Sequence, residues 1–462
     1  MTISIADLDR FGGPRYRALY QALADAITHG RIAPGTRLPP QRQLAYELGV
    51  TVHTVGRAYE LLALDDVVTG QVGRGTYVRD PDTACGQLVC TSPVEGSVID
   101  LRANRPQLAP VETAFRETLR RMTAAGDMAN LVGYAPTAGH AIHREAAARW
   151  LGPLGVDTSA EQILLTNGVQ QGVSLAMMAL ARAGDVIMAP KLGYPHFEAT
   201  CRILHLQRAP VALDGDGLVP DDLERVAKET GARILLVQLN LHNPTSSVTS
   251  AERRQRLAAL ARELDLIVIE DDVYGALLDQ PPPPIQTFVP ERTVYLTSAS
   301  KTLAPGLRLG AAVAPQSLLG RMIDTQHYLK VALPPITAEI FRDWVESGQA
   351  VELTRLQRRE AKARQDLAAK AMAGVAYDAH PSAYHLWVKT GEHRRTSEVL
   401  GLLRDQGVLV LDGDMFAFGH SRRVDAFRVS LCGARNHEQL TKALRLVGRA
   451  LSPETSIAPM VL

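Results

Sequence analysis

From Val98 to the C-terminus, short apolar runs rich in β-branched residues alternate with longer segments of helical periodicity. Runs such as Ile163–Thr166 and Val294–Thr297 have the length of buried strands. Strands that alternate with helices in this way form layered α/β folds with a mainly parallel sheet. We therefore expect residues 98–462 to form one large α/β domain with such a sheet.

Residues 1–80 have a different pattern and contain arginine but no lysine. Apolar residues at helical spacing predict three helices, of which Gly49 ends the second and Thr51 caps the third. Short apolar segments on either side of Gly73-Arg74-Gly75 predict a two-stranded wing with Arg74 at its tip. This order is typical of a winged helix-turn-helix domain of the α+β class. The apolar face expected for the third helix consists of Val52, Val55, Ala58, Tyr59 and Leu62.

Residues 81–97 are rich in Pro, Gly, Ser, Thr and Asp and show neither helical nor strand periodicity, so we expect a linker. The chain has 50 Lys and Arg against 49 Asp and Glu. This balance excludes a strongly nonspecific nucleic-acid binder, although four arginines against one glutamate between Ala26 and Tyr59 permit a local positive face.

Cysteine usage and apolar run lengths exclude further classes of protein. The four cysteines form no C-x-x-C pair, and no cluster has the spacing of a metal site, so we expect neither a disulfide scaffold nor a metal. No apolar run approaches the roughly 18 residues of a membrane span, and the N-terminus does not resemble a signal peptide. We expect a cytoplasmic protein that does not contact a membrane.

Reactive side chains follow several predicted strands of the large domain. Lys301, in Ser298-Ala299-Ser300-Lys301, can form an imine with an aldehyde cofactor. Asn167-Gly168 opens a helix whose first N–H groups can bind a phosphate. Ser298 and Arg308 can hold the same phosphate.

Other residues of this series suit an aromatic ring and a carboxylate. Asp271 follows a predicted strand and can pair with a protonated ring nitrogen, and its three-residue step to Tyr274 favours it over Asp272. Arg428 lies on a late short strand and can hold a carboxylate through two hydrogen bonds. Each motif alone is common in turns, caps and cores, so the prediction of one shared site rests on their joint order.

The segment RLPPQRQLAYELGVTVHTVGRAYELL, followed by GRGTYV, resembles the winged helix-turn-helix of GntR-type bacterial regulators over about residues 12–79. The resemblance implies a double-stranded DNA operator as partner and a DNA-facing set of Arg37, Gln41, Arg42, Thr51, His53, Thr54 and Arg57. It also places Arg74 at a minor groove or a phosphate. The alternative is a three-helix packing module whose arginines are merely solvated.

The ordered set in the large domain resembles the fold-type I aminotransferases over about residues 98–455. The resemblance implies pyridoxal 5'-phosphate bound as a Schiff base to Lys301, with Asp271 at the pyridine nitrogen and Arg428 at the carboxylate of a ligand. Tyr134 is implied to reach the phosphate in a neighbouring subunit, hence a homodimer. The other implied cofactor contacts are Gly168, Val169, Gln170, Ser298 and Arg308 at the phosphate, Tyr194 stacked on the ring, and Asn243 and Tyr274 at the phenolate oxygen.

Together the two domains resemble the MocR subfamily of bacterial transcription regulators over nearly the whole chain. The resemblance implies that the large domain senses an amine or amino-acid effector by aldimine exchange at Lys301 and thereby changes how a dimer binds paired DNA half-sites. Two alternatives stay open. The first is a catalytically active aminotransferase with an accessory DNA-binding domain, and the second is a sensor of pyridoxal phosphate itself.

Two departures from the aminotransferase pattern concern the pocket. Ser246 follows Asn243-Pro244-Thr245, where relatives often have glycine, so we expect a less tight turn. The segment from Gly374 to Trp387 lacks a glycine pair that is common in relatives. We expect this segment to reshape the pocket beside the cofactor.

Overall fold

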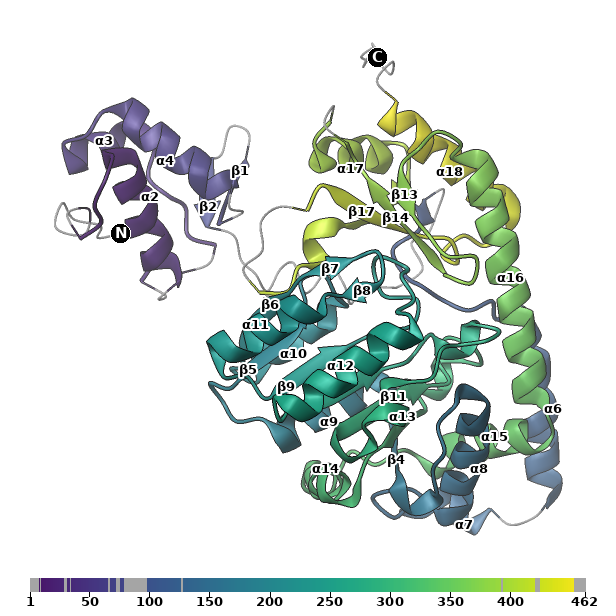
Figure 1. Cartoon of the computed structure of the whole chain (residues 1–462). Coiled ribbons are helices and arrows are strands. Elements are labelled where there is room, and N and C mark those ends of the chain that lie inside the picture. The colour runs from purple at the N-terminus through teal and green to yellow at the C-terminus, as the bar shows by residue number, and fades with distance from the viewer. Residues whose placement is uncertain are drawn as a thin grey trace. The chain divides into compact units, whose positions relative to one another are not determined.

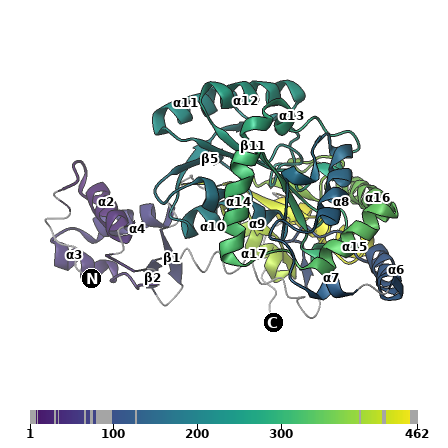
Figure 2. The same ribbon diagram turned by 90° about the horizontal axis from the view of Figure 1, so that it is seen from below.

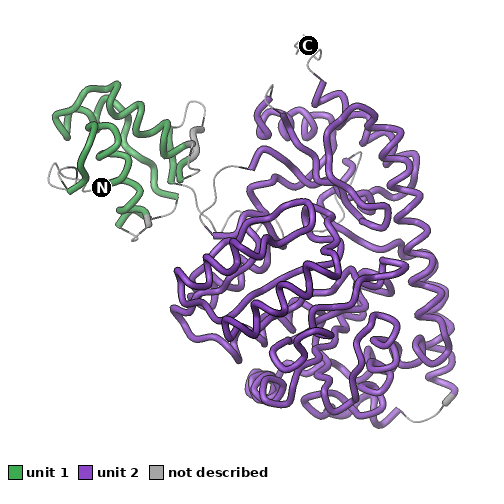
Figure 3. The backbone as a smooth tube through the Cα atoms, viewed as in Figure 1, with its two compact units in different colours: residues 1–93 green, residues 94–462 purple. Residues whose placement is uncertain are grey.

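The computed structural model describes residues 8, 10–28, 31–33, 35–64, 67–71, 75–78, 98–125, 128–391, 394–419 and 424–452. These residues belong to two compact units, residues 1–93 and 94–462 (Figures 1 and 3). Arg74 and the predicted linker, residues 81–97, lie outside the described residues. Within the described ranges, no helix is both long and apolar enough to cross a membrane.

The first unit contains α2 (Arg15–Thr28), α3 (Gln41–Leu48), α4 (Val52–Leu64) and the antiparallel strands β1 (Val68–Gln71) and β2 (Gly75–Val78). Its helices share one apolar core with Leu19, Leu44 and Val55 at the centre. Gly49 ends α3 in the left-handed conformation (φ 62°), and the Thr54 N–H donates to Thr51 Oγ1 (3.1 Å) at the start of α4. The predicted helices, turn and wing are confirmed.

The prediction for one residue of α4 is wrong. Val52 was expected on the apolar face of the helix, but it is 44% exposed. The other four residues of that face are buried. Val52 is the first residue of α4 and lies between the exposed Thr51 and His53, so the core contacts of this helix begin one turn later.

A seven-stranded sheet forms the centre of the second unit (Figure 1). Its strands in order are β4 (Ile163–Thr166), β12 (Gly310–Val313), β11 (Thr293–Ser298), β10 (Ile267–Asp271), β9 (Ile234–Val237), β5 (Val186–Pro190) and β6 (Gln207–Val211). Only β12 runs antiparallel to its neighbours among these strands. The predicted α/β domain with a mainly parallel sheet is confirmed.

Helices cover both faces of this sheet. One face packs against α9 (Val169–Leu180), α10 (Pro195–Ile203) and α14 (Gln316–Leu329), and Figure 2 shows α14 alongside α9. The opposite face packs against α8 (Ala141–Leu151), α15 (Pro335–Glu346), α11 (Pro220–Thr230), α12 (Ala251–Glu263) and α13 (Ile285–Phe288). Leu164 and Leu165 join different cores because successive side chains of a strand point to opposite faces.

A smaller antiparallel sheet contains β13 (Tyr377–Asp378), β14 (His385–Lys389), β17 (Ala426–Ser430) and β16 (Leu411–Asp412). It shares a core with the C-terminal part of α16 (Gln349–Ala371), α17 (Thr396–Asp405) and α18 (His437–Leu451). Next to it, β3 (Ile99–Asp100) pairs in parallel with β15 (Val408–Leu409). The Ser430 N–H donates to Leu101 O (2.8 Å), which places the segment after β3 beside β17.

The remaining described elements are short or peripheral. They are α6 (Ala109–Ala125), α7 (Ala129–Val132), the pair β7 (Leu213–Asp214) and β8 (Gly217–Leu218), and the 3₁₀ turns Gly152–Leu154, Ala160–Gln162, Gly275–Leu277, Pro290–Arg292, Pro305–Leu307 and Gly413–Phe416.

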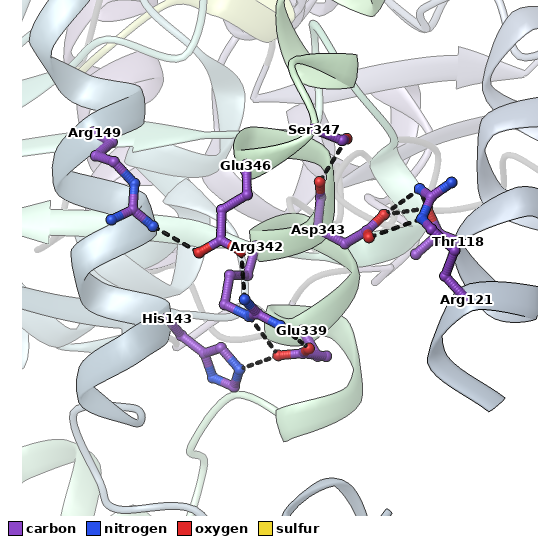
Figure 4. A network of polar contacts seen from close by, with 9 residues as sticks. All are labelled: Thr118, Arg121, His143, Arg149, Glu339, Arg342, Asp343, Glu346 and Ser347. Carbon is purple, nitrogen blue, oxygen red and sulfur yellow. Dashed lines mark hydrogen bonds and ion pairs between the residues drawn. The ribbon is translucent and has the colours of Figure 1, made fainter. Parts of the chain in front are cut away.

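Polar contacts hold α15 between α6 and α8 (Figure 4). Asp343 accepts hydrogen bonds from Thr118 Oγ1 and Arg121 Nη2 of α6 (2.6 and 2.5 Å). On the other side, His143 Nε2 of α8 lies 2.9 Å from Glu339 Oε2. The loop just before α15 is tied to the start of α9, because Val331 O accepts hydrogen bonds from the Asn167 and Gln171 side chains (both 2.9 Å).

Candidate functional site

Lys301 follows β11 at the carboxyl end of the central strands, and we call the polar residues around it the predicted pocket. Its Nζ donates to Asn104 O (2.8 Å) and lies 5.9 Å from the centre of the Tyr274 ring. Burial lowers the pKa of Lys301 to about 8, and the nearby Arg428 acts in the same direction. The neutral amine, which is the form that attacks a carbonyl, is therefore far more populated near pH 7 than in an ordinary lysine, although the protonated form still predominates.

The adjacent carboxylates Asp271 and Asp272 have different environments. Asp271 is buried, accepts the Val273 N–H (3.0 Å), and has its pKa raised to about 7 by burial. Asp272 is buried too, but its two oxygens accept from Asn240 Nδ2 (2.8 Å) and Tyr295 Oη (2.7 Å). Lys301 is among the charges that act on the pKa of Asp271. The choice of Asp271 for a ring nitrogen stays a prediction.

Arg428 lies on β17, near enough to Lys301 to lower its pKa, and is 4% exposed. Its Nη1 donates to Asn243 Oδ1 (2.7 Å), its Nη2 donates to Arg102 O, and its guanidinium lies 5.0 Å from the Phe416 ring centre. Nε has no hydrogen-bond partner among the described residues. A buried cation with an unused donor is suited to an anionic ligand group.

The phosphate end of the predicted site lies at the start of α9. Gly168 has φ 81° at the N-cap, and Arg308 Nη2 donates to Asn167 O (3.3 Å) in the same turn. Val169 and Gln170 are the first two residues of the helix, where backbone N–H groups favour anions. Ser298 Oγ donates to Leu309 O (2.9 Å) beside this turn, so its role at a phosphate stays a prediction.

Two predicted tyrosines differ in exposure. Tyr194 is partly buried at the start of α10, stacked on His196 (4.8 Å between ring centres) and edge-on to Phe197. Tyr134 is fully exposed in the segment after α7. Tyr194 therefore packs against residues of its own chain, whereas Tyr134 presents its ring to the surroundings. The role of Tyr194 at a cofactor ring stays a prediction.

Ser246 closes a hydrogen-bonded turn, and the expectation that this turn is less tight than one with glycine stays a prediction. Ser246 takes the left-handed conformation (φ 61°) that glycine adopts more readily, and its N–H donates to His242 O at 2.6 Å. Asn243 and Pro244 are joined by a cis peptide bond in this turn. Ser246 Oγ also donates to His385 O (3.2 Å), a contact that glycine cannot make.

Three residues of the pocket were not predicted. Asn104, from the segment after β3, contacts Tyr274 Oη (2.9 Å) and His385 Nδ1 (3.0 Å) through its side-chain nitrogen. Tyr384 Oη donates to Lys301 O (2.6 Å). Tyr384 and His385 lie in the Gly374–Trp387 segment that we expected to reshape the pocket. The departure of this segment from the aminotransferase pattern was the signal in the sequence that pointed to these two residues.

The predicted DNA-facing residues of the first unit lie mainly on its surface. The guanidinium of Arg57 stacks on the Tyr16 ring (4.6 Å), and the half-buried Thr54 is held by Thr51 Oγ1 (2.9 Å). Arg37 packs against the wing, because a Cβ on Gly75 would lie 2.8 Å from Arg37 Nε. The exposed members are Arg37, Gln41, Arg42, Thr51, His53 and Arg57.

Comparisons with known proteins agree with both parts of the chain. The family model for aminotransferase class I and II matches residues 96–447, and that for bacterial regulatory proteins of the gntR family matches residues 15–78. The uncharacterized HTH-type transcriptional regulator YdeF of Bacillus subtilis is 29% identical over 449 residues, 97% of this chain and 96% of its own.

Two further similarities cover most of the chain. The probable rhizopine catabolism regulatory protein MocR of Rhizobium meliloti is 26% identical over 375 residues, 75% of this chain and 74% of its own. The structure of the kynurenine aminotransferase of Pyrococcus horikoshii is similar with a TM-score of 0.73 at 22% identity, and covers 82% of this chain and 95% of its own. The fold predicted for each part is thereby confirmed.

Proposed function

Because the chain belongs to the aminotransferase class I and II family and carries a GntR-type helix-turn-helix domain, we propose that its large domain senses a small amine and thereby controls DNA binding. The combination of domains is that of HTH-type DNA-binding regulators of the MocR type, as the sequence predicted. Pyridoxal phosphate is the cofactor of this family of domains.

The residues of the pocket fit this cofactor at each of its functional groups. The turn at Gly168 with Arg308 suits its phosphate, and the buried Asp271 suits its protonated ring nitrogen. Asn243 and Tyr274 are assigned to its ring oxygen, and Lys301 is the amine beside them. When bound, the cofactor supplies a carbonyl carbon that forms a Schiff base with an amine.

One observation carries the sensor proposal: the two groups that an amino-acid effector would engage both contact the segment after β3. Lys301 Nζ donates to Asn104 O (2.8 Å), and Arg428 Nη2 donates to Arg102 O. Ser430 Oγ donates to Ala103 O (2.8 Å) in the same segment. Because β3 begins two residues after the predicted linker, these contacts join the pocket to the chain that leads to the DNA-binding domain.

An effector therefore acts on this segment in two ways. Its amine competes with Lys301 for the cofactor, and the freed Lys301 donates to Asn104 O as the structure has it. Its carboxylate competes with Arg102 O for the donors of Arg428. Both changes alter hydrogen bonds of residues 102–104, and a ligand shifts an equilibrium between conformations only through such differential contacts.

The site is completed by a second copy of the chain in this proposal. Tyr134, Val132 and Tyr328 are exposed by 106%, 83% and 81%. Exposed apolar side chains of this size support a partner-binding surface where they form a contiguous patch. A homodimer buries them and brings Tyr134 to the partner's cofactor phosphate. Two copies also present two helix-turn-helix domains to paired DNA half-sites.

The test measures the affinity of the holoprotein for DNA fragments selected by binding, with and without a panel of amino acids and other amines. We expect at least one compound to change both the cofactor absorbance and, by about fivefold or more, the DNA affinity. The sensor function would be overturned if at least one amine changed the cofactor absorbance at a saturating concentration but none of the amines changed the affinity for DNA.

A second candidate function is transamination, which the lowered pKa of Lys301 favours because a neutral lysine can take a proton from a bound substrate. Rapid turnover with a keto-acid acceptor and no specific DNA binding is the result that supports it. A third reading is sensing of the cofactor itself. In that case, removal of pyridoxal phosphate alone switches DNA binding, and added amines have no effect.

A further inference from the structure

A series of buried hydrogen bonds lies behind the Tyr274 hydroxyl. The His385 ring contacts His242 O through Nε2 (3.4 Å) and the Asn104 amide nitrogen through Nδ1 (3.0 Å). The same Asn104 nitrogen lies 2.9 Å from Tyr274 Oη. Since the side chains of His385, Asn104 and Tyr274 are buried, water does not compete strongly for these contacts.

The backbone carbonyl at the far end of the series fixes the direction of its protons. His242 O only accepts, so His385 Nε2 carries the proton of that contact. Burial holds the pKa of His385 well below its ordinary value, which leaves Nδ1 as an acceptor. Asn104 then donates one amide proton to His385 Nδ1 and the other to Tyr274 Oη. The reversed amide is unfavourable because it would place Asn104 Oδ1 against the lone pair of His385 Nδ1.

We propose that Asn104 and His385 are positioning residues that turn the Tyr274 hydroxyl proton toward the ring oxygen of the bound cofactor. Because Tyr274 Oη already accepts a proton from Asn104, its own O–H is left for a different acceptor. A donor at the ring oxygen stabilises the anionic form of that oxygen and lowers the proton affinity of the Lys301 nitrogen linked to the cofactor. The inference rests on the proposed contacts of Lys301 and Tyr274 with the cofactor.

The backbone of Asn104 strengthens this assignment, because Asn104 O accepts from Lys301 Nζ (2.8 Å). One residue therefore contacts both the lysine and the tyrosine. The other ionisable groups that act on the pKa of Lys301 or Tyr274 are Asp271, Arg308, Arg428 and Cys432. None of these groups is changed in the variants described below.

The test is a pH titration of the holoprotein, followed by the absorbance of the bound cofactor. We expect Asn104→Ala to raise the pKa read from this absorbance by on the order of one pH unit, in the same direction as Tyr274→Phe. Adding Asn104→Ala to Tyr274→Phe should give no further shift, because Asn104 acts through the tyrosine. Asn104→Asp keeps the volume but cannot donate when ionised, and should also raise the pKa.

Gln365→Leu is the matched control, since Gln365 is a buried amide that donates to Ala383 O (2.7 Å) and His385 O (3.3 Å). It should lower Tm and leave the absorbance pKa unchanged. An unchanged pKa in both Asn104 variants, or a shift that adds to that of Tyr274→Phe, overturns the proposal. Neither result depends on DNA binding, so failure here is distinguishable from failure of the sensor function.

Discussion

At the residue scale, Asp271 and Asp272 are neighbours in the chain with different hydrogen-bond partners, and we propose different roles for them. Asp271→Asn removes the charge assigned to the ring nitrogen, so we expect the affinity for pyridoxal phosphate to fall by roughly ten- to a hundredfold. Asp272→Asn disturbs the contacts with Asn240 and Tyr295 instead and should mainly lower Tm. Cofactor titration and thermal unfolding of both variants separate the two effects. If Asp272→Asn weakened cofactor binding and Asp271→Asn mainly lowered Tm, the carboxylate at the ring nitrogen would be Asp272.

The sequence identified those site residues whose side chains lie on a predicted strand or closely follow one. Lys301, Asp271 and Arg428 follow or lie on apolar strands that are visible in the sequence, and the structure brings them near enough for Asp271 and Arg428 to act on the pKa of Lys301. Asn104 and His385 were missed because they are separated by 281 positions and acquire their role only through a tertiary contact. Val52 was misassigned because helical spacing predicts which side of the helix a residue lies on, but not at which residue the helix begins to contact the core.

At the scale of elements, the turn before α9 depends on its close contact with β12. A Cβ added to Gly310 would lie 2.7 Å from the carbonyl carbon of Gly168. Gly310→Ala should therefore displace the turn and weaken binding of pyridoxal phosphate, as measured by cofactor titration. Gly320→Ala in α14 is the control, because nothing lies within 4 Å of the added Cβ and the change should stabilise the helix by about 0.5–1 kcal/mol. Equal cofactor affinity in both variants would contradict this role of the turn.

Helix α15 supplies a prediction about pH. A hydrogen bond from Arg342 lowers the pKa of Glu339, burial opposes this, and His143 adds to the lowering. A carboxylate whose pKa is lower in the folded state stabilises the fold above its unfolded pKa of about 4.3, and this contribution is lost as the pH falls through the folded pKa. Glu339→Gln should thus cost about 1 kcal/mol at pH 7 and progressively less below about pH 4.

Urea unfolding of wild type and Glu339→Gln at several pH values measures this difference. Glu112→Gln is the control, because Glu112 and Arg116 form an exposed pair with side chains 66% and 68% accessible. We expect a negligible effect there, since exposed pairs contribute little. A cost of Glu339→Gln that is equal at pH 7 and pH 3.5 would contradict the assigned direction of the pKa.

The elements themselves were largely predictable, and their ends were not. Strand β9 ends at Val237 although the mainly apolar segment continues to Leu239, and β10 extends beyond the apolar run Leu266–Ile269 as far as Asp271. Apolar composition persists where β9 passes into its loop, whereas β10 continues through two carboxylates because Asp271 pairs with Leu296 of β11. Sheet pairing therefore sets the ends of these strands, and it is not visible in the local sequence.

At the scale of the whole molecule, the proposed dimer makes each cofactor site depend on two chains. In Lys301→Ala the lysine proposed to hold the cofactor is absent, and in Tyr134→Ala the tyrosine proposed for the partner's phosphate is absent. A mixed dimer of the two variants has one site with its own Lys301 and the partner's Tyr134, and a second site with neither. Because Tyr134 is fully exposed, its replacement should leave the fold of each chain unchanged.

Random mixing gives about half mixed dimers, so roughly a quarter of all sites should regain tight cofactor binding. The measurement is cofactor absorbance at a pyridoxal phosphate concentration that leaves Tyr134→Ala dimers mostly empty. A mixture that binds no more cofactor than its Tyr134→Ala component would show that Tyr134 does not act across subunits. Recovery of the expected fraction would instead mean that Tyr134 of one chain completes the cofactor site of the other, so that the cofactor-bound state requires the dimer.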